Sequence, residues 1–93
     1  MQVVWADSAK KTYIDIIEQL FKKWNISIVE NFEFQVNQLI FNIEKHNHIC
    51  PKSTFEGLHK CFINPHNSLI YRLKNKNCIE IVIFIFNQSE HVF

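Results

Sequence analysis

The apolar positions of this chain change their period near its middle. Over residues 9–43 they recur every three or four residues, which is the spacing of one face of an α-helix. From residue 58 onward they alternate or run together, as they do in β-strands. This change of period favours an α+β fold, in which helices pack on one face of a mainly antiparallel sheet.

The first half predicts a short strand and a helix. The strand covers Met1–Trp5, and the helix is expected to be capped by Asp7 or Ser8 and to end near Asn25, because Asp and Ser side chains accept from free N–H groups at a helix start. The apolar face of this helix contains Ala9, Tyr13, Ile16, Ile17, Leu20, Phe21 and Trp24.

A second helix is expected to start at Ser27 and to run to about His46. Ser27 and Glu30 have the spacing of a capping box, in which each side chain bonds to the other residue's backbone. Its apolar face contains Val29, Phe32, Val36, Leu39, Ile40 and Ile43. The short link between the helices predicts an antiparallel hairpin.

The second half predicts three strands after a polar connection over Asn47–Gly57. The strands are Leu58–Ile63, Ser68–Leu73 and Cys78–Phe86, joined by polar turns, and a loose tail follows from residue 87 to residue 93. The expected order is β-α-α-β-β-β, in a single domain over residues 1–93.

The last strand is apolar on both faces. Regular alternation places Ile79, Ile81, Ile83 and Ile85 on one face and Val82, Phe84 and Phe86 on the other. A strand of this kind is central, or one of its faces is covered by something else. Val82, Phe84 and Phe86 are therefore candidate partner-binding residues.

Phe34 and Phe41 are a second candidate partner-binding surface. They are seven residues apart and lie about 150° from the centre of the second helix's core face. Paired surface aromatics indicate a binding surface, whereas scattered ones are normal on any protein. Both interpretations stay open at this stage.

Composition and charge narrow the functional classes. The chain has 93 residues and a formal net charge of +1, which does not indicate a nucleic-acid binder. Cys50, Cys61 and Cys78 are an odd number without a close pair, so we expect a reduced, cytoplasmic chain. The start lacks a basic leader, and no apolar run reaches the ~18 residues of a membrane span.

His46, His48 and Cys50 alternate along the polar connection, as ligands on an extended segment would. Zinc needs three or four ligands in a tetrahedral array, and no second cluster completes the set. We therefore expect a solvated loop, with no metal site and no cofactor.

Basic side chains gather around the second and third strands. They are His59, Lys60, His66, Arg72, Lys74 and Lys76. Such a group would suit phosphate or acidic side chains, or it is an ordinary solvated set. The candidate catalytic residues are His59, Lys60, Arg72 and His91, but no acid–base pair, catalytic triad or Gly-rich phosphate loop accompanies them.

The whole pattern resembles the RelE/ParE toxin superfamily of bacterial type II toxin–antitoxin systems. The residues that carry the resemblance are Trp5, Ala6, Tyr13, Ile17, Trp24, Phe32, Val36, Ile40, Leu58-His59-Lys60, Leu69-Ile70-Tyr71-Arg72-Leu73 and Ile79–Phe86. The motifs are diffuse, and the order of elements is the stronger part of the match.

The resemblance implies a small cytoplasmic toxin that is neutralised by a cognate antitoxin and forms an oligomer with it. RelE-like members cleave mRNA on the ribosome, whereas ParE-like members are held to act on DNA gyrase. His59 stands where an Arg is common, and residues 87–90 replace a basic or His-containing segment. The resemblance thus favours the ParE-like branch, with a RelE-like endonuclease or a degenerate, non-toxic module as alternatives.

Overall fold

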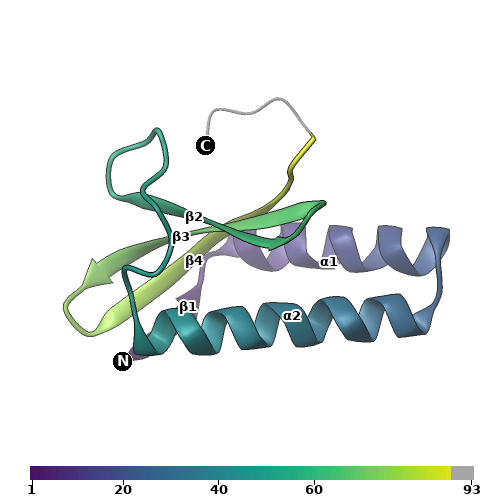
Figure 1. The fold of residues 1–93 in the computed structure, drawn as a ribbon, viewed down its shortest axis with the longest axis horizontal. Coiled ribbons are helices and arrows are strands. Elements are labelled where there is room, and N and C mark those ends of the chain that lie inside the picture. Colours follow the sequence, from purple (N-terminus) through teal and green to yellow (C-terminus); the bar gives the residue numbers. More distant parts are fainter. Residues whose placement is uncertain (89–93) are drawn as a thin grey trace.

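The computed structural model of the chain describes residues 1–88. Its elements are β1 (Gln2–Trp5), α1 (Asp7–Lys23), α2 (Ile26–Lys45), β2 (Leu58–Asn64), β3 (Asn67–Asn75) and β4 (Cys78–Phe86). The two helices form an antiparallel hairpin beside a four-stranded, mostly antiparallel sheet (Figure 1). The predicted α+β fold and its order of elements are confirmed.

The first strand joins the sheet beside the last one. The strand order is β1-β4-β3-β2, and β1 is parallel to β4 with Gln2 opposite Cys78, while the other pairs are antiparallel. Since β1 is short, it covers only the first part of β4. Beyond β1, side chains of α1 bond to the free backbone groups of β4. Ser8 Oγ donates to the Val82 carbonyl at 2.5 Å, and the Phe84 N–H donates to Thr12 Oγ1 at 3.0 Å.

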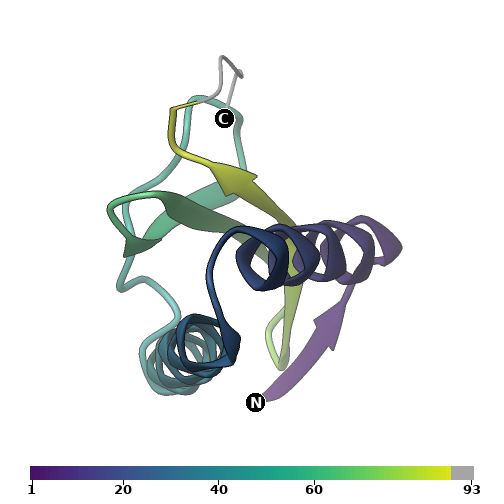
Figure 2. The ribbon, with the colours of Figure 1, turned by 90° about the vertical axis from the view of Figure 1, so that its right-hand side faces the viewer.

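The two helices have different positions on the sheet. α1 runs along β4, and α2 packs against α1 and β2, as the end-on view in Figure 2 shows. Their starts differ from the predicted ones. The capping box at Ser27 is wrong, because the preceding Asn25 is extended and its side chain accepts from the Ile28 N–H at 3.2 Å. α1 has no side-chain cap.

The alternation predicted for β4 is wrong beyond Ile81. Ile83 pairs with Ile70, but Ile81 pairs with the next residue, Tyr71, so that Val82 is the extra residue of a β-bulge. A bulge adds one residue to one strand and thereby exchanges the faces of every residue after it. Consequently the core beneath the helices receives Ile79, Ile81, Phe84 and Phe86.

Phe84 is therefore an interior residue. It is only 2% exposed, and its ring centroid is 5.2 Å from that of Trp5 and 5.2 Å from that of Tyr13. These three rings fill the space between α1 and the sheet. Edge-to-face and tilted ring pairs at this distance stabilise a core beyond their buried area.

The expectation of three reduced cysteines is also wrong. Cys50 and Cys61 form a disulfide with Cα atoms 5.3 Å apart, and Cys78 is free and buried. The sequence did not reveal this pair because the connection after α2 folds back alongside β2. The Lys60 N–H donates to the Pro51 carbonyl at 3.1 Å in this region. Among residues 1–88, no helix combines the length and apolarity that crossing a bilayer requires.

Candidate functional site

The candidate catalytic residues are divided between the two faces of the sheet. His59 pairs with Tyr71, which faces the helices, so His59 faces them too. Lys60 and Arg72 are one position further along their strands and therefore lie on the opposite face. The structure thus brings Lys60 and Arg72 to one face and separates them from His59.

His59 is held as a structural residue. It is 6% exposed, and its ring stacks on the Tyr71 ring at 4.9 Å with an interplanar angle of 14°. Its Nδ1 lies 2.9 Å from the Cys50 carbonyl oxygen. Because a carbonyl oxygen only accepts, Nδ1 carries a proton and donates in this hydrogen bond. The His48 ring lies 5.9 Å away.

Tyr71 completes this buried cluster. Its hydroxyl donates to the Asn47 carbonyl at 2.9 Å. Burial raises the pKa of the Tyr71 phenol above its ordinary value, and a backbone hydrogen bond at Cys50 opposes part of that increase. The phenol therefore stays neutral near pH 7 and serves as a donor to the connection after α2.

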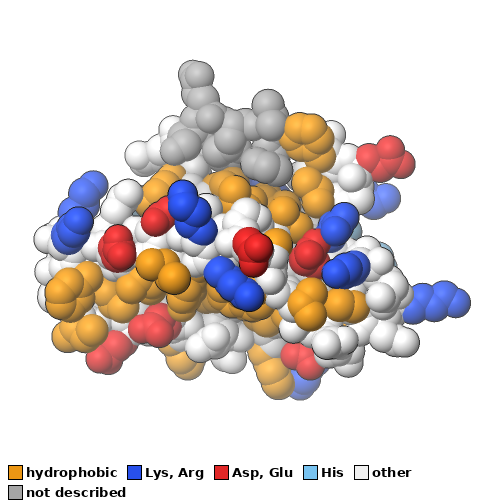
Figure 3. Space-filling view, turned by 180° about the vertical axis from the view of Figure 1, so that it is seen from behind, with side chains coloured by type: hydrophobic (Ala, Val, Ile, Leu, Met, Phe, Trp, Pro, Cys, Tyr) orange, Lys and Arg blue, Asp and Glu red, His pale blue; other side chains and the backbone are white. Residues whose placement is uncertain are grey.

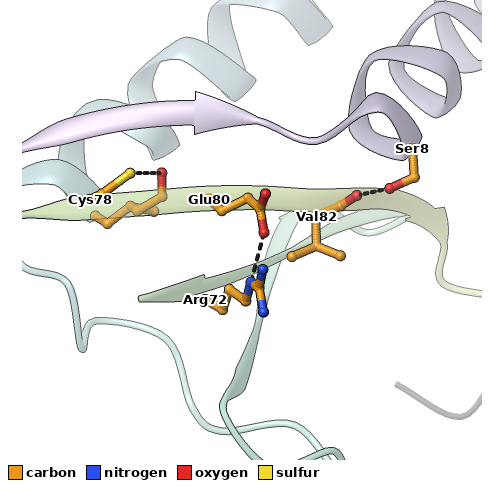
Figure 4. A network of polar contacts seen from close by, with 6 residues as sticks. Ser8, Arg72, Cys78, Glu80 and Val82 are labelled. Carbon is orange, nitrogen blue, oxygen red and sulfur yellow. Dashed lines mark hydrogen bonds and ion pairs between the residues drawn. The ribbon is translucent and has the colours of Figure 1, made fainter. Parts of the chain in front are cut away.

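Arg72 is paired with an acid that faces it across the hairpin. Its Nε lies 2.7 Å from Glu80 Oε1 (Figure 4). Arg72 is opposite Glu80 in the β3–β4 register. The sequence could have predicted this pair, because the two opposite charges are at equal distances from the turn. The carboxylate offsets the guanidinium charge and occupies one of its donors.

The other predicted cations do not join a common centre. Lys60 Nζ lies 5.6 Å from the centroid of the Phe62 ring, and His66, Lys74 and Lys76 are exposed in or near turns. His91 lies outside the described residues. Over residues 1–88, no three His, Cys, Asp or Glu side chains are placed to hold a metal ion.

Exposed aromatics are concentrated on the helical hairpin. Phe34 is 64% and Phe41 is 51% exposed, and Lys45 Nζ lies 4.4 Å from the Phe41 centroid. Phe21 and Trp24 were predicted in the core face of α1, but they are exposed at the end of the hairpin. Among residues 1–88, the strands end before this part of the hairpin (Figure 1), so the helical period alone could not show that it is exposed.

A groove of ≈ 500 Å³ lies between this end of the hairpin and the end of β4. Its apolar lining is formed by Leu20, Trp24, Ile28, Phe32 and Phe86. Lys23 is its only Lys, Arg, Asp or Glu side chain among the described residues. Of the three β4 candidates for partner binding, Phe86 lines this groove, Val82 is half-buried at the bulge and Phe84 is in the core.

The charged side chains form no patch of one sign on the face that α1 presents. Figure 3 shows this face from behind, with acidic and basic side chains interspersed over its described part. A protein that binds a phosphate backbone usually gathers cations on one face. This face therefore does not resemble a strong nucleic-acid interface.

The sequence matches no protein-family model and no curated protein. Solved structures do match it. The YoeB/ParE toxin from Agrobacterium tumefaciens superposes with a TM-score of 0.68, at 17% identity, over 94% of this chain and 99% of that one. The chain has the fold of these toxins.

Two further structures agree with this result. The YoeB dimer from Staphylococcus aureus has a TM-score of 0.62 at 18% identity and covers 89% of this chain and 92% of its own. A copper-bound mutant toxin from Helicobacter pylori has a TM-score of 0.65 at 16% identity, over 94% of each chain. At such low identity the likeness establishes the fold, and function needs its own argument.

Proposed function

We propose that this protein is the toxin of a type II toxin–antitoxin system, which inhibits a macromolecular target by binding it and is neutralised by a cognate antitoxin. The observation that carries the proposal is the likeness to the Agrobacterium tumefaciens YoeB/ParE toxin over 94% of this chain and 99% of that one. Both chains are thus built almost wholly from the same elements, which leaves little of either outside the common fold.

The separation of the candidate catalytic residues supports the ParE-like branch, for which DNA gyrase is the candidate target. Cleavage of RNA by its ribose hydroxyl needs a base, an acid and cations around one phosphate. In the described chain His59 is buried on the helix face, and Arg72, on the other face, is paired with Glu80. A buried histidine and an arginine that is already paired with a carboxylate do not provide the base and the free cation that RNA cleavage needs.

The alternative function is a RelE-like, ribosome-dependent mRNA endonuclease. Lys60 and Arg72 share one face of neighbouring strands, and this is the observation in its favour. In that case their cations would contact the RNA phosphate.

Induced expression in a bacterial host separates the two functions. Growth arrest with a DNA-damage response, and loss of gyrase supercoiling in vitro, is the expected result. Lys60→Ala and Arg72→Ala should leave the arrest unchanged, as should the control Lys74→Ala, which is on the same strand as Arg72. The opposite result is growth arrest with fragmented mRNA, in which Lys60→Ala and Arg72→Ala each abolish the fragmentation and Lys74→Ala does not. That result would establish the endonuclease instead.

We further propose that the antitoxin contacts the exposed face of α2 at Phe34 and Phe41 and the groove that Phe86 lines. Amphipathic segments bind such surfaces through apolar anchors. Co-expression with the adjacent small open reading frame should yield a complex. Phe34→Ala and Phe41→Ala should weaken it, whereas Phe62→Ala should not, although Phe62 on β2 is at least as exposed as either. Equal affinity of all three variants would refute this contact surface.

A further inference from the structure

The disulfide fastens the connection after α2 onto the sheet. Cys50 belongs to the connection and Cys61 to β2, eleven residues later. Besides this covalent bond, the connection is held near β2 by the backbone bonds from Lys60 to Pro51 at 3.1 Å and from Ser53 to Leu58 at 2.8 Å. Hydrogen bonds at the edge of a sheet open locally, and a cross-link between the same segments limits that opening.

The same connection covers His59. The Cys50 carbonyl accepts from the imidazole, Lys52 forms a bridge with the His59 backbone, and the His48 ring lies 5.9 Å from the His59 ring. Tyr71 stacks on the ring and bonds to Asn47 at the start of the connection. The burial of His59 therefore depends on the position of a segment that the disulfide ties down.

The two cysteines differ in exposure. Cys50 is partly exposed, whereas Cys61 is buried. A reductant thiolate would therefore attack Cys50 Sγ and form a mixed disulfide with it, while Cys61 Sγ leaves as a thiolate and takes up a proton. A second reductant thiol then attacks the reductant's sulfur and releases Cys50. Two reductant thiols are oxidised to one disulfide, and two protein thiols are formed.

We propose that the Cys50–Cys61 disulfide is a redox-controlled latch, whose reduction by thiols of the glutathione or thioredoxin class releases residues 47–57 from β2 and opens His59 to solvent. The inference goes beyond the proposed function and does not depend on it, because it concerns this chain's own cysteines and histidine. It adds a redox-dependent state to a fold whose helices and remaining strands stay in place.

Acylation of histidine by diethyl pyrocarbonate tests the latch. The full-length protein is compared after oxidation by glutathione disulfide and after reduction by reduced glutathione, and each histidine is followed by peptide mass spectrometry. The acylation rate of His59 should rise roughly tenfold or more on reduction, since the cross-link no longer limits local opening. His66, which is exposed in the β2–β3 turn, is the internal control and should change less than about twofold.

Two variants separate the latch from general loosening. Cys50→Ser should show the fast His59 rate without any reductant, and Cys78→Ser, which keeps the disulfide pair, should show the slow rate until it is reduced. Far-UV circular dichroism should stay the same in both redox states. Any of three results would overturn the proposal. They are equal acylation rates of His59 in the two redox states, three free thiols after oxidation, and loss of the circular dichroism signal on reduction.

Discussion

Phe84→Ala is the substitution that best tests the bulge at Val82. The bulge places Phe84 in the core, where it is 2% exposed and lies 5.2 Å, between ring centroids, from both Trp5 and Tyr13. Truncation of a buried Phe to Ala costs about 3–5 kcal/mol. The two lost ring pairs, each worth about 0.5–1.5 kcal/mol, put the expected loss in the upper part of that range.

Urea unfolding followed by far-UV circular dichroism measures this loss of stability. The matched control is Phe34→Ala, since Phe34 is 64% exposed and its truncation should change the free energy of unfolding by less than about 0.5 kcal/mol. Without the bulge, Phe84 would face away from the helices, so truncation would resemble the control. A loss below about 1 kcal/mol for Phe84→Ala would therefore refute the placement of the bulge.

Three further predictions concern the cross-link, the buried phenol and the ion pair. Cys50→Ser should lower the free energy of unfolding by about 3 kcal/mol in urea, because the disulfide closes a short loop in the unfolded chain; no loss in oxidised protein would contradict this. Because the pKa of Tyr71 is raised in the folded protein, the unfolded chain loses its proton first, so stability should fall as the pH rises above 10.0. Tyr71→Phe should flatten that slope in alkaline urea titrations, and an unchanged slope would contradict the assignment. Arg72→Ala should lower the free energy of unfolding in urea by less than about 1 kcal/mol, since the Arg72 side chain is 48% exposed in its ion pair with Glu80. A loss above about 2 kcal/mol would show that the pair is shielded from solvent.

The helices show what local patterns can predict. The core face of α2 was found correctly, since Val29, Phe32, Val36 and Ile43 are all buried. Each of these positions follows from the 3.6-residue period alone. Trp24 satisfied the period of α1 equally well but is 66% exposed, because a helical face is buried only as far as another element extends to cover it.

The candidate site was less predictable. The sequence identified Arg72 and His59 as chemically interesting, but not Glu80 as the partner of Arg72 or Tyr71 as the partner of His59. These partners lie on neighbouring strands, and their register depends on turns and bulges that a single sequence does not show. The residue types were thus visible, whereas their pairing was not.

By itself, the sequence determined the order of the elements and the apolar faces of the helices, because both follow from the spacing of residues close together in the chain. Only the tertiary structure decided the parallel pairing of β1 with β4, the bulge at Val82 and the disulfide between Cys50 and Cys61. Each of these joins or offsets segments that meet only when the whole sheet forms. Such contacts depend on the packing of all the elements together, and so no local pattern contains them.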